Sequence, residues 1–447
     1  MKSINELFKD IPETIKSGVT MRHPNDGIVI YSGEFKLTYE DKVVELGGQI
    51  EFKWYPSVGV EFRGFIGESS VEWKELLSIE TIKFDLIVEG LIFGKCLLTK
   101  TSFGERGHVE GTTVGLSVKG DKSIGVSKIR FCLLNFRDFL GGIVKEETKV
   151  GKNRLVLESD DFKIILDKKM DFKAAVEVLR IQGGYFTTWN GEITKTKGNI
   201  LFDEIKDELE CLTAFLTFVN GKRCSPMFIQ GLHEEQVIWT DYSAYSNDQH
   251  KNVSSWAHSY SIEGLAKLWT NFRALWKKGV DHKDFLVSAI HWYVEANMNS
   301  GRTEGAIIMA QTALELIYNW YIVEQLKLIV GKDAESIIAA NKIRLLISQL
   351  KTGSEIPSAL SHVKAIPDVT DGPDAFVKIR NAIVHSQEEK RKTLRNIHPL
   401  AMFDALQLGL WYTELSLLKI FDFNGDYQNR CVRNGFKSEA NRPVPWK

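Results

Sequence analysis

The first half of the chain alternates apolar and polar residues with a period of two, which is the pattern of half-buried β-strands. The alternating stretches are short, end in Gly, Asn or Asp, and are not separated by long helical patterns. They cover residues 27–40, 43–64, 82–100, 109–120, 127–136, 153–168 and 185–194. Many short strands in succession predict an antiparallel sandwich or barrel.

One helix interrupts this β-rich region, at residues 203–221. Gly221 stands where a helix C-cap is expected. The predicted helix carries an apolar stripe formed by Leu209, Leu212, Ala214, Phe215, Leu216 and Phe218. Two further strands are predicted at 225–231 and 235–242, so the β-rich region extends to about residue 245.

The second half of the chain changes to the helical spacing of apolar residues. Its helical stretches cover residues 262–279, 281–299, 302–327, 341–350, 372–389 and 397–421. Short polar loops join them, which predicts an α-helical bundle. The expected fold class is therefore α+β: a β-rich N-terminal domain at 1–245, linking helices at 246–300, an all-α domain at 301–425, and a basic, loosely ordered C-terminal tail at 426–447.

Composition and charge narrow the choice of partners. A chain of 447 residues, 43% hydrophobic and 26% charged, has the length of two or three domains and the composition of a soluble globular protein. Its 57 Lys and Arg balance 58 Asp and Glu, so a nucleic acid would have to be held by a local site. The most apolar long stretch, 306–323, contains Gln311, Glu315 and Asn319, so no membrane partner is expected.

The cysteines indicate the compartment. Five cysteines without a C-x-x-C pair, and no apolar leader, favour reduced thiols in a cytoplasm.

Familiar catalytic signatures are missing from the sequence. It contains no G-x-x-x-x-G-K-[ST] phosphate loop, no H-E-x-x-H metal helix and no G-x-S-x-G elbow. Cys211, Cys224 and His233 match no compact zinc spacing. We therefore expect no metal and no other cofactor.

One late helix carries a candidate site. Asp371 can cap this helix, with Pro373 at an early position. Asn381 and His385 are four residues apart and share a face, while Arg380 is displaced from His385 by roughly 140° around the axis. A fixed cation, an amide and a titratable base together suit a phosphodiester substrate. The alternative is that Arg380 and His385 are ordinary residues beside an apolar stripe.

This segment resembles the HEPN family. The run from Arg380 to His385 matches the R-N-x-x-x-H signature of HEPN domains, and the resemblance covers roughly residues 300–423. The order of a β-rich domain followed by this bundle also resembles ApeA-type bacterial anti-phage proteins. The resemblance implies a metal-independent ribonuclease in which Arg380 and His385 are the invariant pair and Asn381 is the favoured polar residue. It also implies that two motif helices meet across a homodimer to form one active site.

The expected function is an endoribonuclease toxin of phage abortive infection. His385 would transfer protons near neutral pH, and Arg380 would hold the phosphate, while the 2′-OH of RNA attacks to leave a 2′,3′-cyclic phosphate. Transfer RNA is the preferred substrate and messenger RNA the alternative, and the β-rich domain would restrain the enzyme or sense a phage-derived trigger. The competing hypothesis is a non-catalytic HEPN module that binds nucleotides or proteins, combined with a ligand-sensing β domain.

Other residues of the helical domain have possible auxiliary roles, each with an alternative. Glu315 either orients Arg380 or pairs with a surface lysine. A basic set either follows an RNA backbone or is a solvated helix surface: Lys378, Lys390, Arg391, Lys392 and Arg395. An apolar set is expected to exceed what one small bundle can bury and so to favour a dimer through the C-terminal domain: Ile307, Ile308, Leu314 and Ile317.

Overall fold

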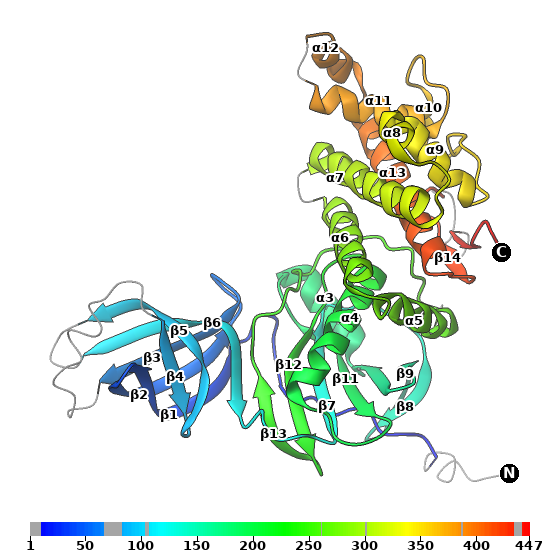
Figure 1. The fold of residues 1–447 in the computed structure, drawn as a ribbon. Helices are drawn as coiled ribbons and strands as arrows, with labels where there is room; N and C mark the ends of the chain where they lie inside the picture. The colour runs from blue at the N-terminus through cyan, green and yellow to red at the C-terminus, as the bar shows by residue number, and fades with distance from the viewer. Residues whose placement is uncertain are drawn as a thin grey trace. The chain divides into compact units, whose positions relative to one another are not determined.

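The chain folds into two compact units in a computed structural model, shown in Figure 1. The structure describes residues 10–66, 83–102, 107–260, 262–299, 302–385, 388–432 and 440–447. The first unit, which is β-rich, combines Met1–Glu210 with Cys224–His250, and the second, helical unit combines Cys211–Arg223 with Lys251–Lys447. The region 246–300, expected to hold linking helices, lies almost wholly in the helical unit.

Six antiparallel strands close into a barrel at the start of the β-rich unit. They are β1 (Ile28–Tyr39), β2 (Lys42–Lys53), β3 (Gly59–Ile66), β4 (Phe84–Val88), β5 (Leu91–Ser102) and β6 (His108–Gly120). Their order is β3-β2-β1-β4-β5-β6, and pairing of β3 with β6 closes the ring. Gly111 permits this closure, because a Cβ built there would lie 2.4 Å from the ring of Phe62 on the neighbouring strand. Of the two predicted architectures, the barrel is the one observed.

A second group of strands continues the same sheet. It contains β7 (Lys128–Leu134), β8 (Gly142–Glu146), β9 (Lys149–Glu158), β10 (Phe162–Lys168), β11 (Thr187–Lys195), β12 (Pro226–His233) and β13 (Gln236–Asp241). Their order is β13-β12-β7-β11-β10-β9-β8, and β13 pairs with β6, which gives 13 strands in all. Two helices accompany them, α3 (Phe172–Gln182) and α4 (Phe202–Asn220), whereas the sequence predicted only the second. The predicted cap of α4 is confirmed, because Gly221 has a φ of 72°.

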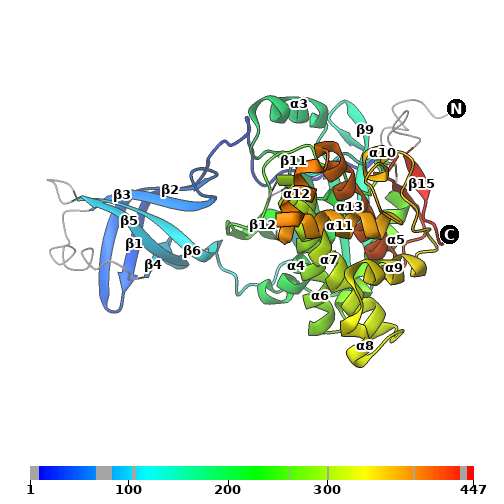
Figure 2. The ribbon, with the colours of Figure 1, turned by 90° about the horizontal axis from the view of Figure 1, so that it is seen from above.

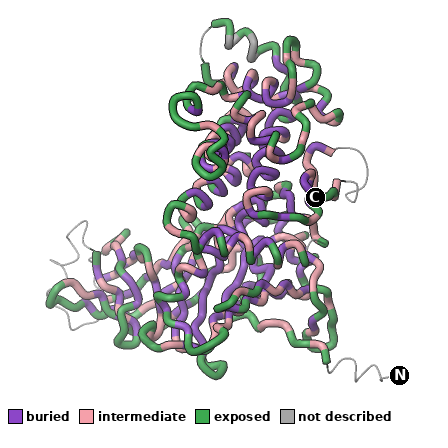
Figure 3. Tube along the Cα trace, turned by 45° about the vertical axis from the view of Figure 1, so that its right-hand side comes forward, coloured by how far each residue is buried: buried purple, intermediate pink, exposed green. Residues whose placement is uncertain are grey.

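The helical unit contains the helices that carry the candidate site. They are α5 (Ile262–Trp276), α6 (Val280–Asn297), α7 (Arg302–Ile317), the π-helix η1 (Tyr318–Gln325), α8 (Gly331–Ser336), α9 (Ala339–Gln349), α10 (Ser361–Lys364), α11 (Gly372–Val384), α12 (Glu388–Asn396) and α13 (Pro399–Ile420). Helix α13 is the central one, because it packs against α6, α7, α10 and α11 and buries most of its residues. Figure 1 and Figure 2 show α10 and α11 beside α13, and Figure 3 shows that buried residues occupy the interior of the helical unit.

Helix α7 fills the core rather than offering a surplus of apolar side chains. Ile307, Leu314 and Ile317 are at most 1% exposed, and only Ile308, at 36%, reaches the surface. The expectation that this set exceeds the needs of one bundle is therefore wrong, because α6, α11 and α13 all cover α7. By length and composition, Arg302–Gln325 could cross a membrane, but 56% of that window is buried inside the unit, as in the core helix of a folded domain.

The described parts of the C-terminal segment, 426–432 and 440–447, are folded, which corrects for these residues the expectation of a loosely ordered tail at 426–447. Strands β14 (Asp426–Gln428) and β15 (Asn441–Pro443) pair with each other. Tyr427, Val444 and Trp446 are buried, and the Trp446 indole donates to the carbonyl of Phe423 at 2.8 Å. Apolar burial and a buried ion pair hold this segment, although few of its residues are apolar.

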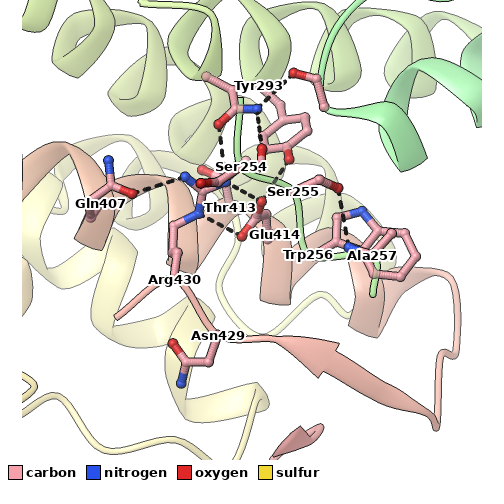
Figure 4. Close-up of polar contacts among 12 residues, drawn as sticks. Ser254, Ser255, Trp256, Ala257, Tyr293, Gln407, Thr413, Glu414, Asn429 and Arg430 are labelled. Carbon is pink, nitrogen blue, oxygen red and sulfur yellow. Dashed lines mark hydrogen bonds and ion pairs between the residues drawn. The ribbon is translucent and has the colours of Figure 1, made fainter. Parts of the chain in front are cut away.

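The ion pair joins Arg430 to Glu414 of α13 (Figure 4). The Glu414 side chain is 0% exposed and that of Arg430 is 4% exposed. Arg430 Nε donates to Glu414 Oε2 at 2.8 Å, and Nη2 donates both to Oε1 and to Asn297. The Tyr293 hydroxyl also donates to Glu414 at 2.7 Å. Burial alone would lower the pKa of Arg430, but the Glu414 carboxylate raises it above its ordinary value.

Candidate functional site

Helix α11 begins as the sequence predicts. The Asp371 carboxylate accepts from the backbone N–H of Asp374 at 3.0 Å, and Pro373 lies in the first turn. Arg344 of α9 holds the same carboxylate with two hydrogen bonds, of 2.7 and 2.8 Å. Burial raises the pKa of Asp371, but the hydrogen bonds from Arg344 outweigh burial and leave that pKa below its usual range. This capped start fixes the helix that carries the motif.

Loss of the cap should weaken the helical unit in a pH-dependent way. We expect Asp371→Ala to lower the free energy of unfolding by about 1–2 kcal/mol at neutral pH. Because the folded pKa lies below the unfolded value of about 3.9, the contribution is complete above that value. It is lost as the pH falls through the lowered folded pKa. Urea denaturation between pH 3 and pH 7 measures this, with the exposed Asp333→Ala as control. The prediction is contradicted if wild type and Asp371→Ala differ in their free energy of unfolding by as much at pH 3 as at pH 7.

The motif residues lie at the other end of α11. Arg380 is half-buried, and its Nη1 donates to the side-chain oxygen of Asn381 at 3.1 Å. Its Nε atom is buried and has no hydrogen-bond partner among the residues that the structure describes. His385 is exposed and caps the helix, with φ −90° and ψ 104°, and its backbone N–H bonds to the carbonyl of Asn381 at 3.0 Å. Helix α11 ends at Val384, and the backbone becomes extended at His385. The imidazole is therefore attached just beyond the last turn of the helix.

Packing of α11 on α13 places this end beside the start of α13. Gly372 lies against Tyr412, and Gly409 lies against the ring of Phe376, so residue numbers rise along α11 while they fall along α13. The two helices are therefore antiparallel. One turn beyond Phe376 comes Arg380, and one turn before Gly409 comes Ala405. Along the direction of the helix axes, Arg380 therefore has the same height as the first two turns of α13.

Glu315 and Lys378 have partners other than those expected from the sequence. The Glu315 carboxylate accepts from Gln311, one turn earlier in α7, at 3.0 Å. Neither an ion pair with Arg380 nor one with a lysine is found for it among the described residues. Lys378 donates to the backbone carbonyls of Pro367 at 2.7 Å and Asp368 at 3.4 Å. It therefore ties the loop before α11 to the helix.

Helix α12 carries the rest of the predicted basic set. Lys392 is 65% exposed and pairs with Glu388 at 3.0 Å, and Arg395 is exposed in the last turn. The side chains of Lys390 and Arg391 lie outside the described residues. The helix follows α11 directly, so its cations belong to the same end of the unit as Arg380.

A polar cluster that the sequence did not reveal lies at this end too. His362 of α10 meets Asp404 of α13: ring Nδ1 and backbone N lie 3.3 and 3.2 Å from Asp404 Oδ2. Asp404 is 0% exposed, and the His362 side chain is 37% exposed. The ring of His398, the N-cap of α13, is stacked on that of His362 at 5.5 Å and 11°. His362 is more than 30 residues away from His398 and Asp404 in the sequence, so no local spacing could have indicated the cluster.

Cysteines and acidic residues do not build a metal centre in the part of the chain that the structure describes. No group of three or more His, Cys, Asp or Glu residues there could hold a metal ion. All five cysteines are described and buried, and none of them is in a disulfide. Burial raises the pKa of Cys96 to about 12, which keeps its thiol protonated.

Comparison with known proteins places the chain near one family. The model of the YopA central domain matches residues 121–253, and the model of the YopA C-terminal domain matches residues 280–440. A relative, the "SPbeta prophage-derived uncharacterized protein YopA" of Bacillus subtilis (strain 168), is 27% identical over 434 residues, which are 95% of this chain and 96% of the relative. No solved structure matches the chain. The motif and the histidine cluster both fall within the match to the C-terminal domain.

Proposed function

We propose that this chain is a metal-independent endoribonuclease whose phosphodiester site contains Arg380, Asn381 and His385. The observation that carries the proposal is that the Arg380 guanidinium is partly buried and incompletely hydrogen-bonded. Its guanidinium is half-buried, its Nε has no hydrogen-bond partner, and within the described residues no carboxylate pairs with it. A buried donor without an acceptor is costly, so an anionic oxygen from a ligand would complete the site.

The reaction needs few groups, because RNA carries its own nucleophile. The 2′-oxygen forms a bond to phosphorus, the bond from phosphorus to the 5′-oxygen breaks, and the products are a 2′,3′-cyclic phosphate and a 5′-hydroxyl. Arg380 would hold the non-bridging oxygens, while Asn381, which accepts from Arg380, would fix the guanidinium plane. His385, exposed at the helix end, would carry the proton for one of the two oxygens.

Transfer RNA incubated with the purified full chain in EDTA tests the proposal. We expect internal cuts whose 5′ fragments end in a cyclic phosphate, recognised because phosphatase removes the end group only after acid opening. Intact RNA at high protein concentration, with and without a phage lysate, would contradict the activity. The proposal extends to a role in phage defence, as the resemblance in the sequence implies.

The same proposal includes a homodimer formed through the helical unit. One chain supplies a single Arg380–His385 set, whereas the two oxygens that exchange protons need an acceptor on one side and a donor on the other. A two-fold axis would bring two motif helices together. We expect light scattering to show a dimer, and dimers with one His385→Ala chain to lose at least about 90% of the activity. A fully active monomer would contradict this assembly.

The barrel offers a place for a trigger. A groove of about 440 Å³ runs over its outer face, lined by Glu51 of β2, Glu61 and Arg63 of β3 and Glu110 of β6, among others. Lys53 donates to Glu61 at 2.7 Å and Arg63 to Gln49 at 2.9 Å, so the groove is polar and mixed in charge. This groove supports the assignment of the β-rich unit as a sensor, both in the enzyme and in a non-catalytic binding protein.

A further inference from the structure

The groove on the barrel has an ordered polar lining, because its side chains stand in rows across neighbouring strands. Pairing of β2 with β3 sets Glu51 directly opposite Glu61, and two residues along the strands it sets Gln49 opposite Arg63. The residues between them, such as Ile50, point into the barrel and are buried. Successive rows on one face of a sheet are roughly 6.5–7 Å apart.

Two irregularities of the sheet shape the groove. The pairing of β5 with β6 shifts register between Leu98 and Lys100, so Thr99 is an extra, bulged residue in the lining. Gly111 of β6 contributes no side chain, and a Cβ there would collide with the ring of Phe62. Bulges are frequent beside active sites, because they redirect a side chain. The volume of about 440 Å³ lies within the roughly 300–1,000 Å³ of ligand sites.

Two charged groups in the groove have no partner of opposite charge among the described residues. The Glu51 carboxylate takes part in no ion pair there, and it lies over Gly27, where a Cβ would collide with Oε1. Arg63 is exposed and donates to the neutral side chain of Gln49 at 2.9 Å. Glu51 and Arg63 are diagonal neighbours on the sheet, so their Cα atoms are roughly 7–8 Å apart. An anion and a cation are thus left for a ligand.

The overall charge of the groove is unfavourable for a nucleic acid. Glu61 pairs with Lys53 at 2.7 Å, and Glu110 lies 3.5 Å from Lys100 in an exposed pair. Among the lining residues, three carboxylates face only two cations, Lys53 and Arg63. A polyanion needs an excess of cations along its path, so a ligand that carries both charges fits better.

An aromatic pair continues the groove beyond Arg63. The next row sets Phe65 opposite His108, and their rings are 5.1 Å apart. Nε2 of His108 is 3.7 Å from the carboxylate of Glu110, which lines the groove, so the aromatic pair adjoins it. Phe65 is 55% exposed, and Gly47, opposite it on β2, has no side chain to cover the ring. The surface therefore presents an aromatic ring, a cation and an anion in successive rows.

We propose that the groove binds an extended protein segment whose aromatic, acidic and basic side chains, at alternate positions, contact Phe65, Arg63 and Glu51. The side chains on one face of an extended segment repeat every 6.5–7 Å or so, roughly the spacing of the rows on the barrel. Pairing of β3 with β6 leaves no free strand edge at the groove, so side chains rather than backbone pairing carry the recognition. The segment would belong to the trigger of the β-rich unit, and only this consequence rests on the proposed function.

A blocked peptide, acetyl-Phe-Thr-Asp-Thr-Lys-amide, tests the site on the full chain and without RNA. Saturation-transfer NMR detects weak binding and gives its Kd by titration. We expect Glu51→Gln and Arg63→Gln each to raise Kd about three- to fivefold, as the loss of a partly exposed ion pair does. Phe65→Ala should raise Kd about fivefold, because it removes the aromatic contact.

An exchange of the two free charges gives the sharpest comparison. The double variant Glu51→Arg with Arg63→Glu keeps the net charge of the chain. It should prefer the charge-reversed peptide, acetyl-Phe-Thr-Lys-Thr-Asp-amide, whereas the wild type prefers the first peptide. The matched control, Lys36→Glu with Glu45→Lys, exchanges an exposed pair of the barrel outside the groove and should leave both Kd values unchanged.

Three results would overturn the site: a wild type that binds neither peptide, equal affinity of the wild type for both, or no change of preference in the exchanged variant. Displacement of the first peptide by ATP or by single-stranded RNA would also overturn it, because the groove would then be an anion site. The expected pattern of peptide binding in a chain that cleaves no RNA supports the site and rejects only the ribonuclease.

Discussion

We expect Arg380→Ala and His385→Ala each to reduce RNA cleavage by at least about 100-fold. Removal of one group that stabilises transition-state charge costs roughly 100- to 1,000-fold in rate, and removal of a proton-transfer group costs a similar factor. Arg380→Lys should recover little of the loss, because an ammonium cannot hold two phosphate oxygens in the fixed geometry of a guanidinium. Single-turnover cleavage in EDTA gives these rates.

Two controls separate loss of chemistry from loss of structure. His233→Ala removes an exposed histidine of the β-rich unit and should cleave like the wild type. The thermal unfolding of all variants should agree within a few degrees, because the side chains of Arg380 and His385 have no ion pair among the described residues. If His385→Ala cleaves RNA at the same rate as His233→Ala, the assignment of this site as a ribonuclease is wrong. The hypothesis of a non-catalytic binding protein would then be preferred.

The second large effect concerns the buried pair of Glu414 and Arg430. Glu414→Ala should lower the free energy of unfolding of the helical unit by about 3–5 kcal/mol, because it leaves the Arg430 guanidinium buried without its carboxylate. The double variant Glu414→Leu with Arg430→Met should recover most of that loss, since two apolar side chains leave no buried charge. Urea denaturation of the full chain measures both.

A surface pair supplies the comparison for this prediction. Glu388→Ala breaks the exposed pair with Lys392 and should cost less than about 1 kcal/mol. If Glu414→Ala costs no more than Glu388→Ala, then the C-terminal segment does not depend on the buried pair. In that case the apolar contacts of Tyr427 and Trp446 alone would hold it.

Periodicity predicted the elements well where one face of each is buried. The change from period two to helical spacing located the two kinds of structure, and the Asp371 and Gly221 caps were predictable because each acts on residues next to it in sequence. The choice between sandwich and barrel was not predictable, since the closing pair β3–β6 joins segments about 50 residues apart. Local patterns carry no information about such partners.

The site was only partly predictable for the same reason. Arg380, Asn381 and His385 lie within six residues, so a short motif includes them all. The partners of Glu315 and Lys378 could not be derived, because a carboxylate or an ammonium on a helix has several neighbours within reach. Asp404 and Glu414 are isolated acidic residues in an apolar helix, and their partners, His362 and Arg430, come from other segments.

Helix α4 runs without a break from Phe202 to Asn220, while the division between the two units falls inside it, after Glu210. Its second half supplies Phe215 and Phe218, whose rings pack edge-on against Trp269 and Tyr293. A gene fragment that starts at residue 251 would therefore encode a helical unit without part of its own core. The two units therefore cannot be separated at a single position in the chain without dividing the core of the helical unit.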